Sequence, residues 1–135
     1  MTMPDKQSKK ILLVDDEPDL LYFIGSLLRR RGYEIETAGD GIEALNKVKS
    51  GNYDMIITNI NMPGIDGMQL LSEIAKLGKN LIKIVFSGQN DSLTIEKAEK
   101  LGCFAYIHKS SDFEELENAV KRGFNSLKNR NKGTI

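Results

Sequence analysis

Short apolar segments alternate with longer amphipathic segments along almost the whole chain, and this alternation is the strongest constraint on its fold. The apolar segments lie at residues 10–15, 33–38, 55–57, 81–86 and 104–108. The central one, Met55-Ile56-Ile57, is too short for a helix and is dominated by β-branched residues, which is typical of a buried strand. Strict alternation of strand and helix predicts an α/β fold: a parallel sheet with helices on both faces and right-handed crossovers.

The segments between the strands carry helix signals at their ends. Pro18 suits the first position of a helix over residues 18–31, and Gly32 suits the position just after its end. Asp40 followed by Glu43, and Ser111 followed by Glu114, are typical of capping boxes. The predicted helices follow these signals, at residues 18–31, 41–50, 67–77, 92–101 and 112–127. The apolar stripe of the fourth is weak, so we expect that helix to be marginally anchored.

Length and patterning predict one domain. The 135 residues are 40% hydrophobic, enough for a core that stands alone. We expect a flexible amino-terminal tail at residues 1–9, the domain at 10–128 and a polar tail at 129–135. No segment beyond the last helix is long enough to be an output module, so the expected domain is a stand-alone one.

Charge and composition argue against several classes of protein. The chain has 19 basic and 19 acidic residues, whereas nucleic-acid and membrane-surface binders usually have a basic excess. No apolar segment approaches the roughly 20 residues of a membrane span, and the amino terminus has no signal-peptide core. Cys103 is the single cysteine, which excludes a disulfide framework and fits a reducing cytoplasm.

The predicted strands end in residues of related chemistry. These are Asp15 and Asp16 after the first strand, Asn59 after the third, Ser87 after the fourth and Lys109 after the fifth. In parallel sheets these ends share one edge, which is where ligands bind. Paired carboxylates suit Mg²⁺, while an ammonium and a hydroxyl suit a phosphoryl group. The sequence therefore predicts one polar site at the carboxyl edge of the sheet.

Each of these residues also has an ordinary structural explanation. The two aspartates could cap a helix, Ser87 and Asn59 could be turn residues, Lys109 could be solvated, and Tyr106 could be half-buried packing. We expect His108 to lie on the surface, facing away from Lys109 and without partners for a metal. The joint occurrence of the strand-end residues at equivalent topological positions favours the functional interpretation.

The residues Asp15-Asp16, Asn61-Met62-Pro63-Gly64 with Asp66-Gly67, Ser87 and Lys109 together resemble the receiver domain of bacterial response regulators. The resemblance covers about residues 9–128. It implies a flavodoxin-like (βα)5 fold whose five-stranded sheet has the order 2-1-3-4-5.

The resemblance also implies a role for each position. Asp15 and Asp16 would hold Mg²⁺ directly or through water, together with the side chain of Asn59, and Asn61 would lend its backbone carbonyl to the metal. Ser87 would hydrogen-bond the phosphoryl group, and Lys109 would pair with it. Tyr106 resembles the aromatic residue that, with Ser87, forms the activation switch.

Partners follow from the same resemblance. A histidine kinase or a histidine phosphotransfer protein would donate the phosphoryl group to an aspartate, with Mg²⁺ and lysine neutralising charge. An output protein would bind the face made by the fourth helix, the fifth strand and the fifth helix. We expect no direct contact with nucleic acid or membrane, no enzymatic activity beyond self-phosphorylation and dephosphorylation, and a monomer.

The chain departs from the family pattern where the acceptor aspartate aligns with Asn59. A neutral carboxamide lacks the anionic oxygen that attacks phosphorus, so an acyl phosphate cannot form on it. All the partner residues are retained, which favours a deliberate Asp→Asn substitution that traps the unphosphorylated state. The alternative is a natural pseudo-receiver that serves only as a protein-interaction module.

A smaller departure is Ser110, which stands where the family usually has proline. A cis peptide bond before a residue other than proline costs about 2.5–4 kcal/mol, which favours a trans Lys109–Ser110 bond and a differently shaped loop, but the sequence alone leaves cis and trans open.

Two enzymes remain as rival hypotheses. The first is a flavin- or nucleotide-binding enzyme. In such enzymes the first strand-to-helix turn binds a phosphate through glycines or hydroxyls, whereas the acidic turn Asp15-Asp16-Glu17 would repel it. An aspartate-based phosphatase would lack its nucleophile.

Overall fold

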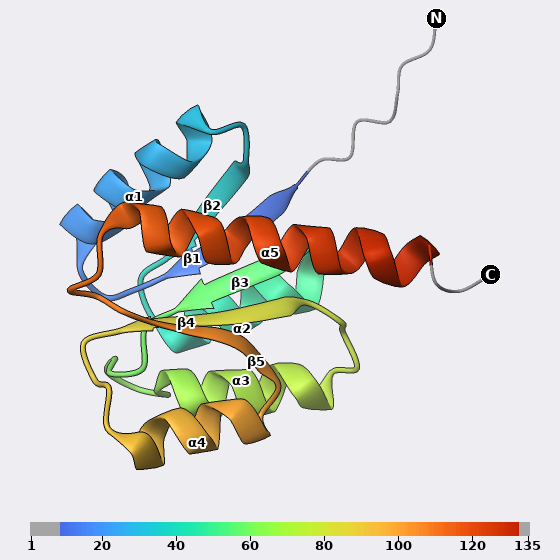
Figure 1. The fold of residues 1–135 in the computed structure, drawn as a ribbon. Helices are drawn as coiled ribbons and strands as arrows, with labels where there is room; N and C mark the ends of the chain where they lie inside the picture. Colours follow the sequence, from blue (N-terminus) through green and yellow to red (C-terminus); the bar gives the residue numbers. More distant parts are fainter. Residues whose placement is uncertain (1–8, 133–135) are drawn as a thin grey trace, which may run out of the picture.

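The computed structural model describes residues 9–132 and contains five strands alternating with five helices (Figure 1). The strands are β1 (Lys10–Val14), β2 (Glu34–Ala38), β3 (Met55–Thr58), β4 (Ile82–Ser87) and β5 (Cys103–His108). The helices are α1 (Pro18–Arg30), α2 (Gly41–Ser50), α3 (Gly67–Lys76), α4 (Ser92–Lys100) and α5 (Phe113–Lys132). All strand pairs are parallel, in the order β2-β1-β3-β4-β5. The predicted fold class and strand order are confirmed.

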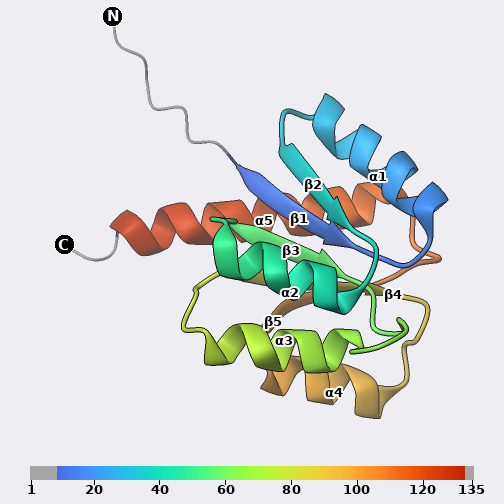
Figure 2. The ribbon, with the colours of Figure 1, turned by 180° about the vertical axis from the view of Figure 1, so that it is seen from behind.

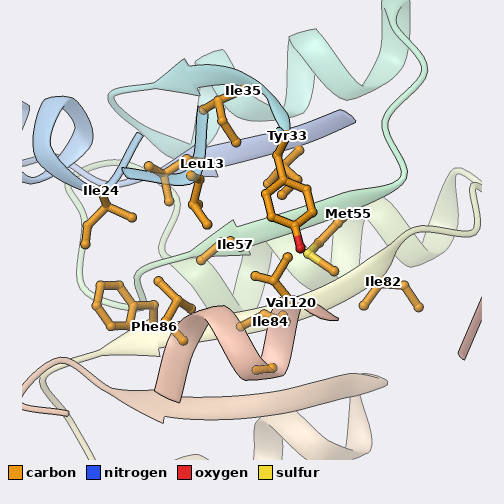
Figure 3. Close-up of a cluster of buried hydrophobic side chains, with 14 of the residues drawn as sticks. Leu13, Ile24, Tyr33, Ile35, Met55, Ile57, Ile82, Ile84, Phe86 and Val120 are labelled. Atoms are coloured by element: carbon orange, nitrogen blue, oxygen red, sulfur yellow. The ribbon is translucent and has the colours of Figure 1, made fainter. Parts of the chain in front are cut away.

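Two hydrophobic layers sandwich the sheet, with helices α1 and α5 on one face and α2, α3 and α4 on the other (Figures 1 and 2). Alternate residues of each strand supply the two layers. In β1, Ile11 and Leu13 face α1 and α5, whereas Leu12 and Val14 face the opposite helices. Figure 3 shows the first layer, in which Val120 of α5 lies over the side chains of β3 and β4. Burial of both faces explains why the strands are almost continuously apolar.

Side-chain caps begin most of the helices at the predicted residues. Asp40, Asp66 and Asp91 each accept a hydrogen bond from the backbone N–H three residues on. Gly32 follows α1 with a φ of 98°, as expected for a glycine after a helix. These caps place the helix starts, and hence the loops that precede them, on the carboxyl edge of the sheet.

The start of α5 differs from the prediction. The N–H of Glu115 is held by Asp112 rather than Glu114 by Ser111, so the helix begins one residue later than a Ser111 cap would place it. The chain around Ser111 is instead a turn, in which the Ser111 N–H donates to the His108 carbonyl over 2.9 Å.

Helix α5 also continues to Lys132, into the segment predicted as a polar tail. Of the predicted amino-terminal tail, residues 1–8 lie outside the described residues.

The weak apolar stripe of α4 has the expected consequence. Ala98 is the buried residue of that helix, and Leu93 is 61% exposed. Helix α4 therefore has the smallest buried face of helices α1 to α4.

Candidate functional site

The strand register brings the predicted site residues to one edge of the sheet, at the left of Figure 1. Val14 pairs with Thr58, so the residues that follow them, Asp15 and Asn59, are neighbours. The Asn59 N–H donates to the Val14 carbonyl over 3.0 Å. On the other side, the Lys109 N–H donates to the Ser87 carbonyl over 2.8 Å.

Lys109 joins the two halves of this edge. Its Nζ lies 2.8 Å from Asp15 Oδ2, although β3 and β4 separate β5 from β1. Three strand spacings amount to about 14 Å, so the lysine can reach Asp15 only by extending along the edge over the ends of β3 and β4. Its path brings the ammonium to the side of the edge where Asn59 lies.

Glu17 is a third acid of the site, and no role at this edge was predicted for it. Lys109 Nζ lies 3.4 Å from Glu17 Oε1, and the Glu17 N–H donates to Asp15 Oδ1 over 3.0 Å. The sequence feature that could have indicated this role is the run of three acids, Asp15-Asp16-Glu17. Its third member places a second carboxylate against the lysine while remaining largely exposed.

Asp15 is a buried carboxylate, and only 2% of its side chain is exposed. Burial raises the pKa of Asp15 above its ordinary value, while the hydrogen bonds from Lys109 and from the Glu17 backbone oppose that rise. The Lys109 ammonium is therefore the counterion that favours charge on this carboxyl.

Asn59 is 7% exposed, and both ends of its amide are engaged. Oδ1 accepts from the Ile60 N–H over 2.9 Å, and Nδ2 donates to the Asn61 carbonyl over 2.9 Å. The second bond uses the carbonyl that the resemblance assigns to the metal. The side chain of Asn59 and the backbone of Asn61 are thus in direct contact.

Asp16 points outward from the same edge. It is exposed and lines a hollow of about 470 Å³ together with Asn61 and the turn that follows it. Asp15 and Asp16 therefore approach the predicted metal position differently, Asp15 from the buried side and Asp16 from the open side.

The turn after β3 is held in place by a glycine. The Gly67 N–H donates to the Ile60 carbonyl over 2.8 Å. A Cβ at position 67 would lie 2.1 Å from the Asn59 carbonyl oxygen, so no larger residue fits there without movement of the backbone. The Asp66-Gly67 pair thus combines a helix cap with a close approach of two backbone segments.

The two predicted switch residues are connected through Gln89. Ser87 is fully buried, and its Oγ accepts from the Gln89 N–H over 3.1 Å. The hydroxyl of the half-buried Tyr106 donates to the Gln89 carbonyl over 2.6 Å. The loop after β4 therefore contacts both residues, a link that had no signal in the sequence.

His108 is half-buried and connects two loops, whereas it was predicted to lie on the surface. Its Nε2 lies 2.9 Å from the Gly88 carbonyl, which can only accept, so Nε2 is the donor. The Ser110 N–H donates to Nδ1 over 3.2 Å. No peptide bond in the described part of the chain is cis, so the Lys109–Ser110 bond is trans.

The residues present suit a magnesium ion held largely by water. Mg²⁺ in proteins usually takes one or two carboxylates and keeps several waters. The edge offers the carboxylates of Asp15 and Asp16 and the Asn61 carbonyl. Within residues 9–132 no group of three His, Cys, Asp or Glu side chains is arranged to hold a metal.

A doubly wound (βα)5 domain with an acidic pair, a hydroxyl and a lysine at its carboxyl edge defines a class of phosphoryl-handling signalling domains. The chain belongs to the response-regulator receiver family: residues 11–121 match the family described as "Response regulator receiver domain". It is a signalling module of two-component systems rather than a catalytic enzyme.

Two curated relatives differ in how much of their length this chain covers. The chain is 36% identical over 116 residues to the DNA-binding transcriptional regulator NtrC of Azospirillum brasilense, a match that covers 86% of this chain and 24% of the regulator. It is 26% identical over 115 residues to the sporulation initiation phosphotransferase F of Bacillus subtilis, covering 85% and 93% of the two chains. The chain thus spans about a quarter of the regulator's length and nearly all of the phosphotransferase's.

Solved structures agree with the fold. The receiver domain protein from Methanospirillum hungatei has a TM-score of 0.88 at 27% identity, covering 92% of this chain and 99% of that one. The response regulator TrrA of Thermotoga maritima, in complex with Mg²⁺-BeF, has a TM-score of 0.78 at 39% identity, covering 85% and 98%. In the described part of this chain, no helix has the length and apolar character needed to cross a membrane.

Proposed function

We propose that the chain is a cytoplasmic, monomeric receiver domain of a phosphorelay in which position 59 is the phosphoacceptor position and Asn59 keeps the domain unphosphorylated. The observation that carries this proposal is the ion pair between Lys109 and Asp15 across the ends of β3 and β4. It brings the lysine toward position 59, where it would meet a phosphoryl group. The partner is a histidine kinase or a histidine phosphotransfer protein.

The roles of the residues follow from their places. Asp15, Asp16 and the Asn61 carbonyl would hold Mg²⁺, which when bound neutralises charge on a phosphoryl group. Lys109 would bind a phosphoryl oxygen as a point charge, and the Ser87 hydroxyl would donate to another. Asn59 has no anionic oxygen for attack on phosphorus, so the aspartate that would accept the group is the missing part.

An output partner would bind the face formed by α4, β5 and α5. Leu93 of α4 and Phe104 of β5 are 61% and 39% exposed. Tyr106 lies on the same strand as Phe104, and its contact with Gln89 connects this face to Ser87. A phosphoryl group on position 59 would accept from the Ser87 hydroxyl, whose oxygen also accepts from the Gln89 N–H, so a shift of Ser87 toward the phosphoryl group would move the Gln89 loop.

Two origins of Asn59 are compatible with this function. A deliberate Asp→Asn substitution would trap an otherwise active receiver, and retention of Asp15, Asp16, Ser87 and Lys109 favours it. A natural pseudo-receiver would use the same fold as an interaction module. Because the chain belongs to the receiver family, we no longer favour a flavin-binding enzyme.

Intact-mass measurement tests the proposal. The protein and its Asn59→Asp variant are each incubated with Mg²⁺ and a small phosphoryl donor. We expect one phosphoryl group on the variant and none on the starting protein. Absence of uptake by the variant would contradict the phosphoacceptor assignment and favour the pseudo-receiver.

A further inference from the structure

The Asn59 amide is held in a single orientation by its two neighbours. Oδ1 lies beside the Ile60 N–H, which can only donate, and Nδ2 lies beside the Asn61 carbonyl, which can only accept. A rotated amide would place donor against donor and acceptor against acceptor. The side chain therefore bridges residues 60 and 61 with one donor and one acceptor.

An aspartate at this position could make only one of the two bonds. Its first oxygen could accept from the Ile60 N–H, but its second oxygen would face the Asn61 carbonyl oxygen. Two acceptors in contact repel unless a cation or a proton lies between them. In an aspartate form the gap between the side chain and the Asn61 carbonyl therefore requires a positive group, whereas Asn59 supplies an N–H of its own.

The rest of the edge is also satisfied internally. Lys109 neutralises the buried Asp15, and Ser87 is bonded to the Gln89 backbone. Among the described side chains, no buried nitrogen or oxygen lacks a hydrogen-bond partner. The buried polar side chains of the edge thus all have hydrogen-bond partners among protein atoms.

We propose that the Asn59 side-chain amide takes the place of the divalent cation at the Asn61 carbonyl, so that the loop after β3 is held without metal and Mg²⁺ must displace this amide in order to bind. This inference rests on the magnesium site of the proposed function. Asn59 is then a positioning residue: its Nδ2 occupies the Asn61 carbonyl, a predicted metal ligand, and so weakens Mg²⁺ binding. We call this contact the cap.

If Asn59 blocks the Asn61 carbonyl, both Asn59→Ala and Asn59→Asp should raise the affinity for Mg²⁺, but for different reasons. Asn59→Ala removes the cap and adds no charge, so it should bind Mg²⁺ more tightly than the starting protein even though an oxygen is lost. The gain expected is about 2- to 10-fold in Kd, the equivalent of one net hydrogen bond. Asn59→Asp should bind more tightly still because it adds a carboxylate.

The test is calorimetric titration of Mg²⁺ into the starting protein, Asn59→Ala, Asn59→Asp and Asn52→Ala. Asn52 is exposed before β3, at the other end of that strand, and its variant is the matched control for an Asn→Ala change. Circular dichroism melts without metal establish that each variant is folded. The order expected for affinity is Asp above Ala above the starting protein, with Asn52→Ala equal to the starting protein.

The possible failures are distinguishable. If Asn59→Asp binds Mg²⁺ but Asn59→Ala binds no more tightly than the starting protein, the cap is refuted and the metal site stands. If no variant binds Mg²⁺, both the cap and the proposed metal site are refuted.

A second measurement is independent of the variants. The side-chain NH₂ resonances of Asn59 should show a hydrogen-bonded proton in the metal-free protein and should shift as Mg²⁺ saturates the site. Resonances typical of a solvated amide in the metal-free protein would contradict the proposal.

Discussion

The contact between Lys109 and Asp15 is asymmetric, because the two side chains differ in exposure. The Lys109 side chain is 20% exposed and has Glu17 as a second partner, whereas the Asp15 side chain is 2% exposed. Removing the lysine leaves a buried charge without its counterion, which typically costs several kcal/mol. Removing the charge of the aspartate leaves a lysine that can still pair with Glu17.

This asymmetry predicts unequal costs for the two single substitutions. We expect Lys109→Met to lower the free energy of unfolding by about 3 kcal/mol and Asp15→Asn by less than about 1 kcal/mol. The double variant should recover most of the loss caused by Lys109→Met. Urea unfolding at neutral pH without Mg²⁺ measures all three, and equal costs for the two single variants would show that Asp15 is not a buried, compensated charge.

A second prediction concerns the charge at position 59. Asn59→Asp places a carboxylate beside Asp15 and Asp16, and two like charges about 4 Å apart repel by roughly 4 kcal/mol at an effective dielectric constant of 20. The variant should melt at a lower temperature without metal and should gain more from Mg²⁺ than the starting protein does. Thermal melts with and without Mg²⁺ test this, and equal Mg²⁺-induced shifts would refute a shared site.

At the scale of single elements, the turn between β3 and α3 depends on Gly67. Gly67→Ala would place a methyl group against the Asn59 carbonyl, so the start of α3 must move away from β3. We expect a loss of about 1–3 kcal/mol in the free energy of unfolding, as for overpacked sites. In the control Gly39→Ala the nearest atom is a flexible Glu43 oxygen at 3.8 Å, and chemical denaturation should show little change. Similar losses in both variants would contradict this account of the turn.

Away from the site, Glu36 of β2 connects its own strand to β1 and to the loop before β3. Tyr53, in the loop before β3, donates its hydroxyl to Glu36 Oε1 over 2.6 Å, and Lys10 of β1 lies 3.2 Å from Glu36 Oε2. The Tyr53 hydrogen bond, followed by that of Lys10, lowers the pKa of Glu36. A lowered carboxyl pKa adds stability above the unfolded value of 4.5, and that stability is lost as the pH falls through the folded value.

The expected pH dependence is small because the Glu36 side chain is 40% exposed. Glu36→Gln should cost less than about 1 kcal/mol at neutral pH, and the difference from the starting protein should shrink in acid, below the unfolded value. Urea unfolding at a series of pH values measures it, with Glu34→Gln, exposed on the same strand, as the control. A difference that grows toward acid pH would have the wrong sign for this contact.

At the scale of the whole molecule, the fold could be predicted because its signals are local and repeated. Strand and helix periods, the Asp40 cap and the glycine after α1 each act within a few residues, and the strand order followed from the family resemblance. The helix α5 cap was predicted at Ser111 and lies at Asp112, because two adjacent residues can both cap and only the turn from His108 decides between them.

The site was predicted as a set of positions but not as a set of contacts. Which strand ends meet follows from topology, and the structure places Asp15 beside Asn59 and brings Lys109 to Asp15. The roles of Glu17 and Gln89 depend on the paths of loops, which leave no periodic pattern in a sequence. The same is true of the two hydrogen bonds of Asn59, which depend on the backbone directions of residues 60 and 61.

We propose that one edge of the sheet forms a single phosphoryl site that lacks only its acceptor. Backbone amide NMR of the Asn59→Asp variant with Mg²⁺ and beryllium fluoride is the decisive experiment. We predict that the shift changes centre on residues 15–17, 59–61, 87–89 and 109–111, and that beryllium fluoride causes no such change in the starting protein. Changes centred elsewhere, or the same response in both proteins, would contradict the claim.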